Sequence, residues 1–228
     1  MKKIGILGGI SSASTIQYYK TITDLYYDRS GDYYYPEILI NSLNFQYFTD
    51  LENQRRLEEY QNYIVNGIRQ LQQAGADFVI MAANSPHSVL DKIADRVSLP
   101  IVSIVESVAR RAKALGLKRV LLTGILYTMQ SDFYPNGLRN YGIETLLPDP
   151  AEQTAINDII FKELVLNQTL PESKKHFLSI INSYDADAVI LGCTELPQLI
   201  TQRDSAKTLL NTLRIHCEDA LNYAMQVS

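Results

Sequence analysis

The sequence is poor in cysteine, in excess positive charge and in long apolar runs, and each shortage excludes a class of protein. The two cysteines are too few and too weakly patterned for a disulfide framework, and no group of Cys and His has zinc-ligand spacing. A formal net charge of -4, without a basic stripe interleaved with aromatics, disfavours a nucleic-acid partner. No apolar run is long enough for a membrane span, and the run after Met1-Lys2-Lys3 is too short for a secretory signal. We therefore expect a soluble, reduced, cytoplasmic chain with no membrane partner.

The chain also lacks a linker rich in Pro, Gly or Ser, and it has no segment of low complexity. Its 228 residues fit one large domain or two small ones of roughly 100 residues each, and either size can bury an adequate core. Hydrophobic residues make up 46% and charged residues 20%, which is the balance of a globular protein.

Short apolar runs of strand length alternate with longer segments of helical period. This alternation predicts an α/β fold built on parallel sheet. The expected strands are Lys3–Leu7, Glu37–Asn41, Asp77–Ala82, Pro100–Val105, Arg119–Thr123, Glu144–Leu147, Ala186–Leu191 and Lys207–Leu210. The expected helices are Ser14–Tyr27, Arg55–Gln73, Ser85–Arg96, Glu106–Leu115, Ala151–Leu166, Ser173–Ser183 and Thr212–Met225.

Four of the predicted strand-to-helix junctions end in small or polar residues, and two of them resemble each other. The four are Gly8-Gly9-Ile10-Ser11, Ala83-Asn84-Ser85-Pro86, Thr123-Gly124 and Gly192-Cys193-Thr194-Glu195. Open α/β sheets bind ligands at the carboxyl ends of their strands, where helix N-termini present unpaired N–H groups. The likeness of the junctions after Val79 and Val189 indicates two pseudo-repeated halves.

Cys193 is the first candidate for chemistry. It follows a buried strand at the expected start of a helix, where the positive end of the helix favours thiolate. The alternative is a small buried hydrophobic residue, because free cysteine is among the most buried residue types.

The polar residues around these junctions have two interpretations. Asn84, Ser85 and Thr194 are typical helix N-caps, or their side chains and backbone N–H groups hold a carboxylate. Gly8-Gly9 is a weak signal, because glycines also permit an ordinary tight turn, and its spacing does not match a dinucleotide fingerprint with its later acidic partner. His87 belongs to no recognisable metal set, and we expect it to serve packing or capping.

Taken in order, these junctions and other motifs resemble the aspartate/glutamate racemase family, and most closely its broad-specificity or L-aspartate/glutamate-specific amino-acid racemases. The motifs run along nearly the whole chain: Ile4-Gly5-Ile6-Leu7-Gly8-Gly9-Ile10-Ser11, Ala74-Gly75-Ala76-Asp77, Asn84-Ser85-Pro86-His87, Tyr127-Thr128-Met129, Gly192-Cys193-Thr194-Glu195 and Ile215-His216. The resemblance implies two Rossmann-like domains related by a pseudo-dyad, with the active site at their interface. The implied boundaries are residues 1–99 plus 209–228 for the N-terminal domain and 100–208 for the C-terminal one.

The resemblance also implies a reaction. Members of the family need no PLP, nucleotide or metal, and two acid/base residues, commonly both cysteines, exchange the proton at the substrate Cα. We accordingly expect no cofactor, an amino acid or dicarboxylate as ligand, and a homodimer, for which the tyrosine-rich early segment is a reasonable interface.

Carried over by position, the resemblance makes Cys193 the acid/base thiol of the second half. It implies that the remaining matched positions contact the substrate; these are Ile10, Ser11, Glu52, Asn84, Ser85 and Thr194. Glu52 is preferred to Gln54 for the contact near the substrate's side-chain end.

One position departs from the family pattern. Immediately before Asn84 the family has Cys, or Thr in some relatives, and this chain has Ala83, which cannot transfer a proton. Three hypotheses follow: an amino-acid racemase acting on aspartate, glutamate or a similar substrate; a one-thiol, cofactor-free decarboxylase or isomerase of the same superfamily; and a non-catalytic binder of amino acids.

Overall fold

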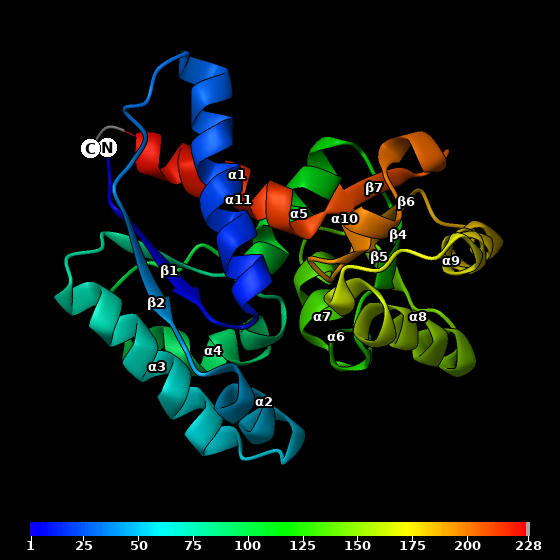
Figure 1. Ribbon diagram of the computed structural model, residues 1–228, viewed down its shortest axis with the longest axis horizontal. Helices are drawn as coiled ribbons and strands as arrows, with labels where there is room; N and C mark the ends of the chain where they lie inside the picture. The colour runs from blue at the N-terminus through cyan, green and yellow to red at the C-terminus, as the bar shows by residue number, and fades with distance from the viewer. Residues whose placement is uncertain (227–228) are drawn as a thin grey trace. The chain divides into compact units, whose positions relative to one another are not determined.

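The computed structural model describes residues 1–226 and divides them into two compact units. Unit 1 consists of residues 1–104 together with the described residues from 216 onward, and unit 2 consists of Val105–Ile215. Each unit is built on its own parallel sheet (Figure 1).

Unit 1 contains a three-stranded sheet in the order β2-β1-β3. Its strands are β1 (Ile4–Gly8), β2 (Ile38–Ser42) and β3 (Phe78–Met81), and all pairs are parallel. Every residue of β1 and β3 is buried, as expected for a parallel sheet covered on both faces. The helices of this unit are α1 (Ser12–Ser30), α2 (Phe45–Asn53), α3 (Leu57–Gln73), α4 (Leu90–Ile93) and the part of α11 (Thr212–Met225) from His216 onward.

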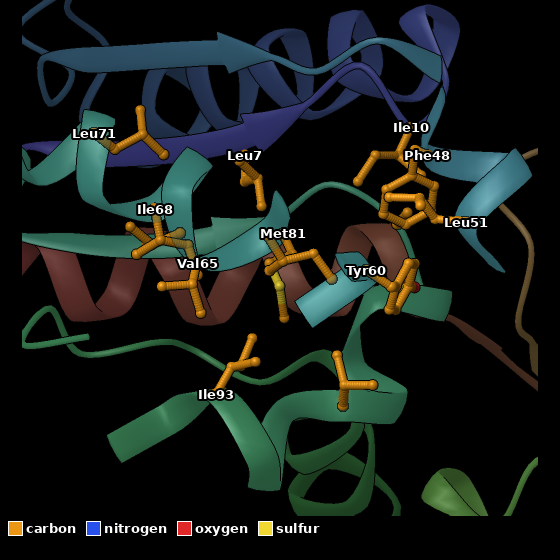
Figure 2. Packing of buried hydrophobic residues seen from close by; sticks show 14 of the residues in the cluster. Leu7, Ile10, Phe48, Leu51, Tyr60, Val65, Ile68, Leu71, Met81 and Ile93 are labelled. Carbon is orange, nitrogen blue, oxygen red and sulfur yellow. The ribbon is translucent and has the colours of Figure 1, made fainter. Parts of the chain in front are cut away.

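The main core cluster of unit 1 lies between β1, β3 and the helices α2 and α3. Leu7 and Met81 contribute from the strands, and Val65, Ile68 and Leu71 contribute from α3 (Figure 2). At one end of the cluster, beyond the carboxyl end of β1, Figure 2 shows the side chains of Ile10, Phe48, Leu51 and Tyr60 close together. This end of the core therefore supports the loops that follow β1 and β3.

Unit 2 contains a four-stranded sheet in the order β5-β4-β6-β7. Its strands are β4 (Arg119–Thr123), β5 (Glu144–Leu146), β6 (Ala188–Leu191) and β7 (Thr208–Asn211), all paired in parallel. Its helices are α5 (Ile104–Ala114), α6 (Leu126–Gln130), α7 (Phe133–Arg139), α8 (Pro150–Lys162), α9 (Pro171–Ser183) and α10 (Leu196–Leu199), together with the first turn of α11. Aliphatic residues of β4 and β6 pack with those of α8 and α9 into one core cluster.

The α/β class with two parallel sheets is confirmed, and one predicted strand is wrong. The segment Pro100–Val105 forms only an isolated bridge between Ile101 and Val79, and α5 begins at Ile104. Proline supplies no N–H to a ladder, so pairing beside β3 is limited to the bonds from Val79 N to Pro100 O and from Val102 N to Val79 O. The other predicted strands form within about two residues of their expected bounds.

The helix predicted over Ser85–Arg96 is also interrupted. It consists of a 3-10 turn over Ser85–Val89, the short helix α4 and a second 3-10 turn over Ala94–Arg96. The irregular first turn directly follows β3 and carries residues of the candidate site.

Candidate functional site

The carboxyl end of β6 carries the segment Gly192-Cys193-Thr194-Glu195, and glycine is required at its first position. The N–H of Gly192 donates to Thr123 O at 2.8 Å, which continues the β4–β6 pairing past the end of both strands. A Cβ at residue 192 would lie 2.5 Å from that same oxygen. The close approach of the two backbones therefore fixes where Cys193 leaves the sheet.

A thiol and a carboxylate meet directly at this strand end. The half-buried Cys193 Sγ donates to Glu195 Oε2 at 2.9 Å, and Thr194 Oγ1 donates to the same oxygen at 2.8 Å. Burial raises the pKa of the Cys193 thiol well above its ordinary value, and the nearby negative charge of Glu195 raises it further. Cys193 is thus a neutral thiol with a carboxylate positioned to accept its proton.

This arrangement corrects the prediction of a thiolate stabilised by a helix. The helix after Cys193, α10, has only four residues and begins at Leu196, with Glu195 in the cap position. Backbone N–H groups of Thr194 and Glu195 lower the pKa of Cys193, but burial and the Glu195 carboxylate outweigh them. Thr194 is therefore not the N-cap of α10, as was predicted; its hydroxyl donates a hydrogen bond to Glu195 instead.

The carboxyl end of β3 carries Ala83, Asn84 and Ser85, all of them buried. Ala83 is part of the core cluster that also contains Ile10, Leu51 and Tyr60. Asn84 occupies the position before the 3-10 turn, but its side chain makes no capping hydrogen bond, so the predicted N-cap role is wrong for this residue. The loop after β3 therefore carries two polar side chains, Asn84 and Ser85, directly after Ala83, which has no titratable group.

Glu52, near the end of α2, lies against this loop. Its Oε1 accepts a hydrogen bond from the Tyr60 hydroxyl at 3.0 Å. Burial raises the pKa of the Glu52 carboxyl above its ordinary value, and the bonds from Ser85 and Tyr60 offset part of that rise. Glu52 thus lies near enough to Ser85, far from it in sequence, for the hydroxyl to lower the pKa of the carboxyl.

The first loop places its two predicted residues differently. Ile10 is buried in the core cluster with Ala83. Ser11 is the N-cap of α1, and its hydroxyl accepts from Ser14 N at 3.3 Å. Gly9 precedes them with φ of 81°, and a Cβ there would lie 2.2 Å from Leu43 O. The loop geometry thus depends on glycine, and the Ser11 side chain stabilises the start of the helix.

His87 is buried below the same loop and serves packing, as predicted. Its Nδ1 lies 3.0 Å from Ala83 O, and its ring packs edge-on against His216 with centroids 5.6 Å apart. His216 in turn contacts the Tyr18 hydroxyl at 2.9 Å. Burial lowers the pKa of His87 to about 3, with a further contribution from His216, so the imidazole is neutral at physiological pH.

Within residues 1–226, no group of three or more His, Cys, Asp or Glu side chains could hold a metal ion. None of the helices in this part of the chain is both long and apolar enough to cross a membrane. The sequence analysis assigned no role to Glu195, which contacts Cys193; the signal for this contact is the spacing Cys-x-Glu directly after a buried strand.

Comparison with known proteins identifies the family of the chain. The family described as Asp/Glu/Hydantoin racemase matches residues 7–220, nearly the whole chain. The chain belongs to this family. Among curated Asp/Glu/Hydantoin racemase relatives, the broad specificity amino-acid racemase RacX of Bacillus subtilis is 27% identical over 218 residues, covering 92% of each chain.

Solved structures show the same Asp/Glu/Hydantoin racemase fold. An aspartate racemase homologue from Pyrococcus horikoshii OT3 superposes with a TM-score of 0.90 at 36% identity, covering 99% of this chain and 100% of the other. The aspartate racemase of Picrophilus torridus superposes with a TM-score of 0.80 at 23% identity, covering 98% and 94% of the two chains.

Proposed function

We propose that the protein is a cofactor-independent amino-acid racemase that exchanges the proton at the Cα of aspartate, glutamate or a similar amino acid. The observation that carries this proposal is the direct contact between Cys193 and Glu195 at the end of β6, in a chain of the Asp/Glu/Hydantoin racemase family. A thiol that holds its proton, with a carboxylate ready to receive it, suits a group that alternates between acid and base.

The chemistry is demanding because an α-proton next to a carboxylate is very weakly acidic. The site must stabilise the carbanionic charge with preorganised donors. We assign this binding role to Asn84, Ser85 and Thr194, with Ile10 and Ser11 contributing contacts from the first loop. Support comes from the burial of Asn84, Ser85 and Thr194, because polar groups in such places have ordered positions.

The test is proton NMR in D2O on both enantiomers of aspartate, glutamate and a panel of other amino acids. The wild-type protein is expected to replace the α-proton with deuterium and to produce the opposite enantiomer. Cys193→Ser should abolish inversion, whereas Cys217→Ala should retain it, because Cys217 is fully buried in α11 with its Sγ 3.9 Å from Tyr18 O. Inversion that survives in Cys193→Ser would contradict the assignment.

A second candidate function is favoured by one observation. Cys193 is a neutral thiol, which suits delivery of one proton to one face of a carbanion. A cofactor-free decarboxylase acting on a malonate-type acid needs only that step. Release of CO2 from such acids, without exchange of any amino-acid α-proton, would favour this function.

We also propose that the protein is a homodimer. Tyr33 and Tyr34, in the loop after α1, are 76% and 78% exposed, and the Tyr33 ring stacks on Tyr27 at 5.0 Å between centroids. Exposed aromatic clusters favour protein interfaces. Light scattering of the wild type should give twice the mass of one chain. The double variant Tyr33→Ser/Tyr34→Ser should give a lower mass.

A further inference from the structure

The first turn of α1 carries two buried hydroxyl side chains, those of Ser14 and Thr15. The other buried residues of this helix are aromatic or aliphatic: Tyr18, Ile22, Leu25 and Tyr26. A buried hydroxyl is costly unless it is hydrogen-bonded, so each of the two needs a partner inside unit 1. Their partners are backbone atoms of the loops that follow β1 and β3.

Ser14 holds the loop after β3. Its hydroxyl donates to Ala82 O at 2.6 Å, and this bond is buried. Ala82 is the first residue beyond β3, and its own N–H donates to Leu7 O at 2.9 Å. The pairing of β1 with β3 ends at Leu7 and Met81, so Ser14 supplies a donor where the sheet no longer provides one.

Thr15 holds the loop after β1. Its Oγ1 accepts a hydrogen bond from Gly9 N at 2.8 Å and donates one to Ser11 O at 2.8 Å. The side chain also packs on the end of the strand, because a Cβ at Gly8 would lie 2.5 Å from Thr15 Cγ2. One side chain therefore fixes the backbone on both sides of Ile10.

We propose that Ser14 and Thr15 are positioning residues of the candidate site, which hold the loops after β1 and β3 in a fixed register. The groups that these loops offer to an amino acid are thereby preorganised. This inference rests on the proposed racemase function, in which both loops bind the substrate. The two hydroxyls act through the loops, because each is already bonded to the backbone.

The bonds of this pair differ from those of an ordinary helical hydroxyl. Thr23, on the same helix, bonds only back to its own turn, at 3.2 Å to Tyr19 O and 2.9 Å to Lys20 O. Ser14 and Thr15 instead bond to backbone atoms outside the helix. Consecutive side chains on a helix point about 100° apart, so adjacent residues can serve two different loops.

The experiment measures initial rates of deuterium wash-in over a range of substrate concentrations. Thr15→Val keeps the shape that packs on Gly8 but removes the hydroxyl, and Thr15→Ser keeps the hydroxyl. Ser14→Ala removes the other hydroxyl, and Thr23→Val is the matched control, because its hydroxyl bonds stay inside α1.

Thr15→Val and Ser14→Ala should raise KM by about 10-fold or more, since the binding groups on the two loops lose their fixed positions. Thr15→Ser should stay within about threefold of wild type, and Thr23→Val should match wild type. A purely structural role would reduce only the fraction of folded protein, which lowers the apparent kcat and leaves KM unchanged. That result would overturn the inference while the racemase assignment stands.

Amide hydrogen exchange tests the same inference without relying on activity. In Thr15→Val the Gly9 amide should lose its protection, because Thr15 Oγ1 is its hydrogen-bond acceptor. In Ser14→Ala exchange should become faster over residues 82–87, whereas α9 in unit 2 should be unaffected in both variants. Unchanged protection of both loops would also overturn the inference. A wild-type protein that exchanges no amino acid would overturn the proposed function, and loop protection would then decide whether the hydroxyl pair holds the loops.

Discussion

The Cys193 thiol and the Glu195 carboxylate lie 2.9 Å apart at the end of β6, and the Thr194 hydroxyl holds the same carboxylate oxygen. Thr194 therefore restricts the carboxylate to the orientation in which it accepts the thiol proton. Burial, together with this pair, raises the pKa of Cys193 although two backbone N–H groups act in the opposite direction.

Replacing Glu195 by Gln should lower the pKa of Cys193 toward its ordinary value, because the amide keeps a hydrogen-bond acceptor but removes the negative charge. The pH dependence of alkylation by iodoacetamide, localised by mass spectrometry, measures this shift. Cys217 is fully buried and should not react in the folded protein. The same variant should reduce racemisation by about 100-fold or more, because the thiol loses the acceptor of its proton. If the pH dependence of alkylation is the same in Glu195→Gln as in wild type, Glu195 does not raise the pKa of Cys193.

His87 should make stability depend on pH. Its pKa falls from 6.5 to about 3 on folding, so unfolding takes up a proton at any pH between these values. The free energy of unfolding should therefore rise with pH in this window, by up to about 1.4 kcal/mol per pH unit, and His87 should add nothing further above it. Urea unfolding of wild type and His87→Gln at several pH values measures the difference in slope.

The matched control for this prediction is His176→Gln, since His176 is an exposed histidine on α9. Taking the difference between each variant and wild type cancels the titration of carboxylates such as Glu52. If the slopes of wild type and His87→Gln coincide between pH 3 and 6.5, the buried imidazole does not contribute.

The sequence was sufficient for elements with strong local signals. Arg119–Thr123 and Thr212–Met225 form over their predicted bounds, because an uninterrupted apolar run and a clear helical period determine them. Pro100–Val105 has the apolar composition of a strand, but its pairing is limited by proline and by the start of α5. Apolar runs of this length do not reveal where sheet pairing stops.

The strand ends of the candidate site were predictable from the sequence, but the contacts made there were not. The strand ends carrying Ala83 and Cys193 follow from the order of elements in an α/β fold. The hydrogen bond from Tyr60 to Glu52 joins α3 to α2, and no local pattern specifies it. Likewise, the turn geometry around Thr194 decides whether Glu195 points to solvent or to the thiol.

Replacing Gly9 should destabilise the protein by a steric clash as well as by backbone strain, and the same replacement at Gly31 measures the strain alone. Gly9 and Gly31 both have positive φ, at 81° and 71°, but a Cβ at residue 9 would meet Leu43 O at 2.2 Å whereas residue 31 has open space. Gly31→Ala should cost about 1 kcal/mol, from backbone conformation alone. Gly9→Ala should cost at least about 2 kcal/mol more, because the loop after β1 must shift. If thermal unfolding gives the same loss of stability for Gly9→Ala and Gly31→Ala, the loop relieves the contact with Leu43 O without a free-energy cost.

Ala83→Cys should convert the strand end of β3 into a direct acid/base site. Ala83 is 9% exposed and belongs to the core cluster with Ile10 and Tyr60, so the added sulfur should cost about 1 kcal/mol of stability. Because Ala83 provides no acid or base, the added thiol should raise the rate at which an amino-acid α-proton exchanges with solvent above the wild-type rate. The measurement is deuterium wash-in for wild type and Ala83→Cys, with thermal unfolding as the check on folding. A folded variant that exchanges no faster than wild type would show that residue 83 does not reach the substrate Cα.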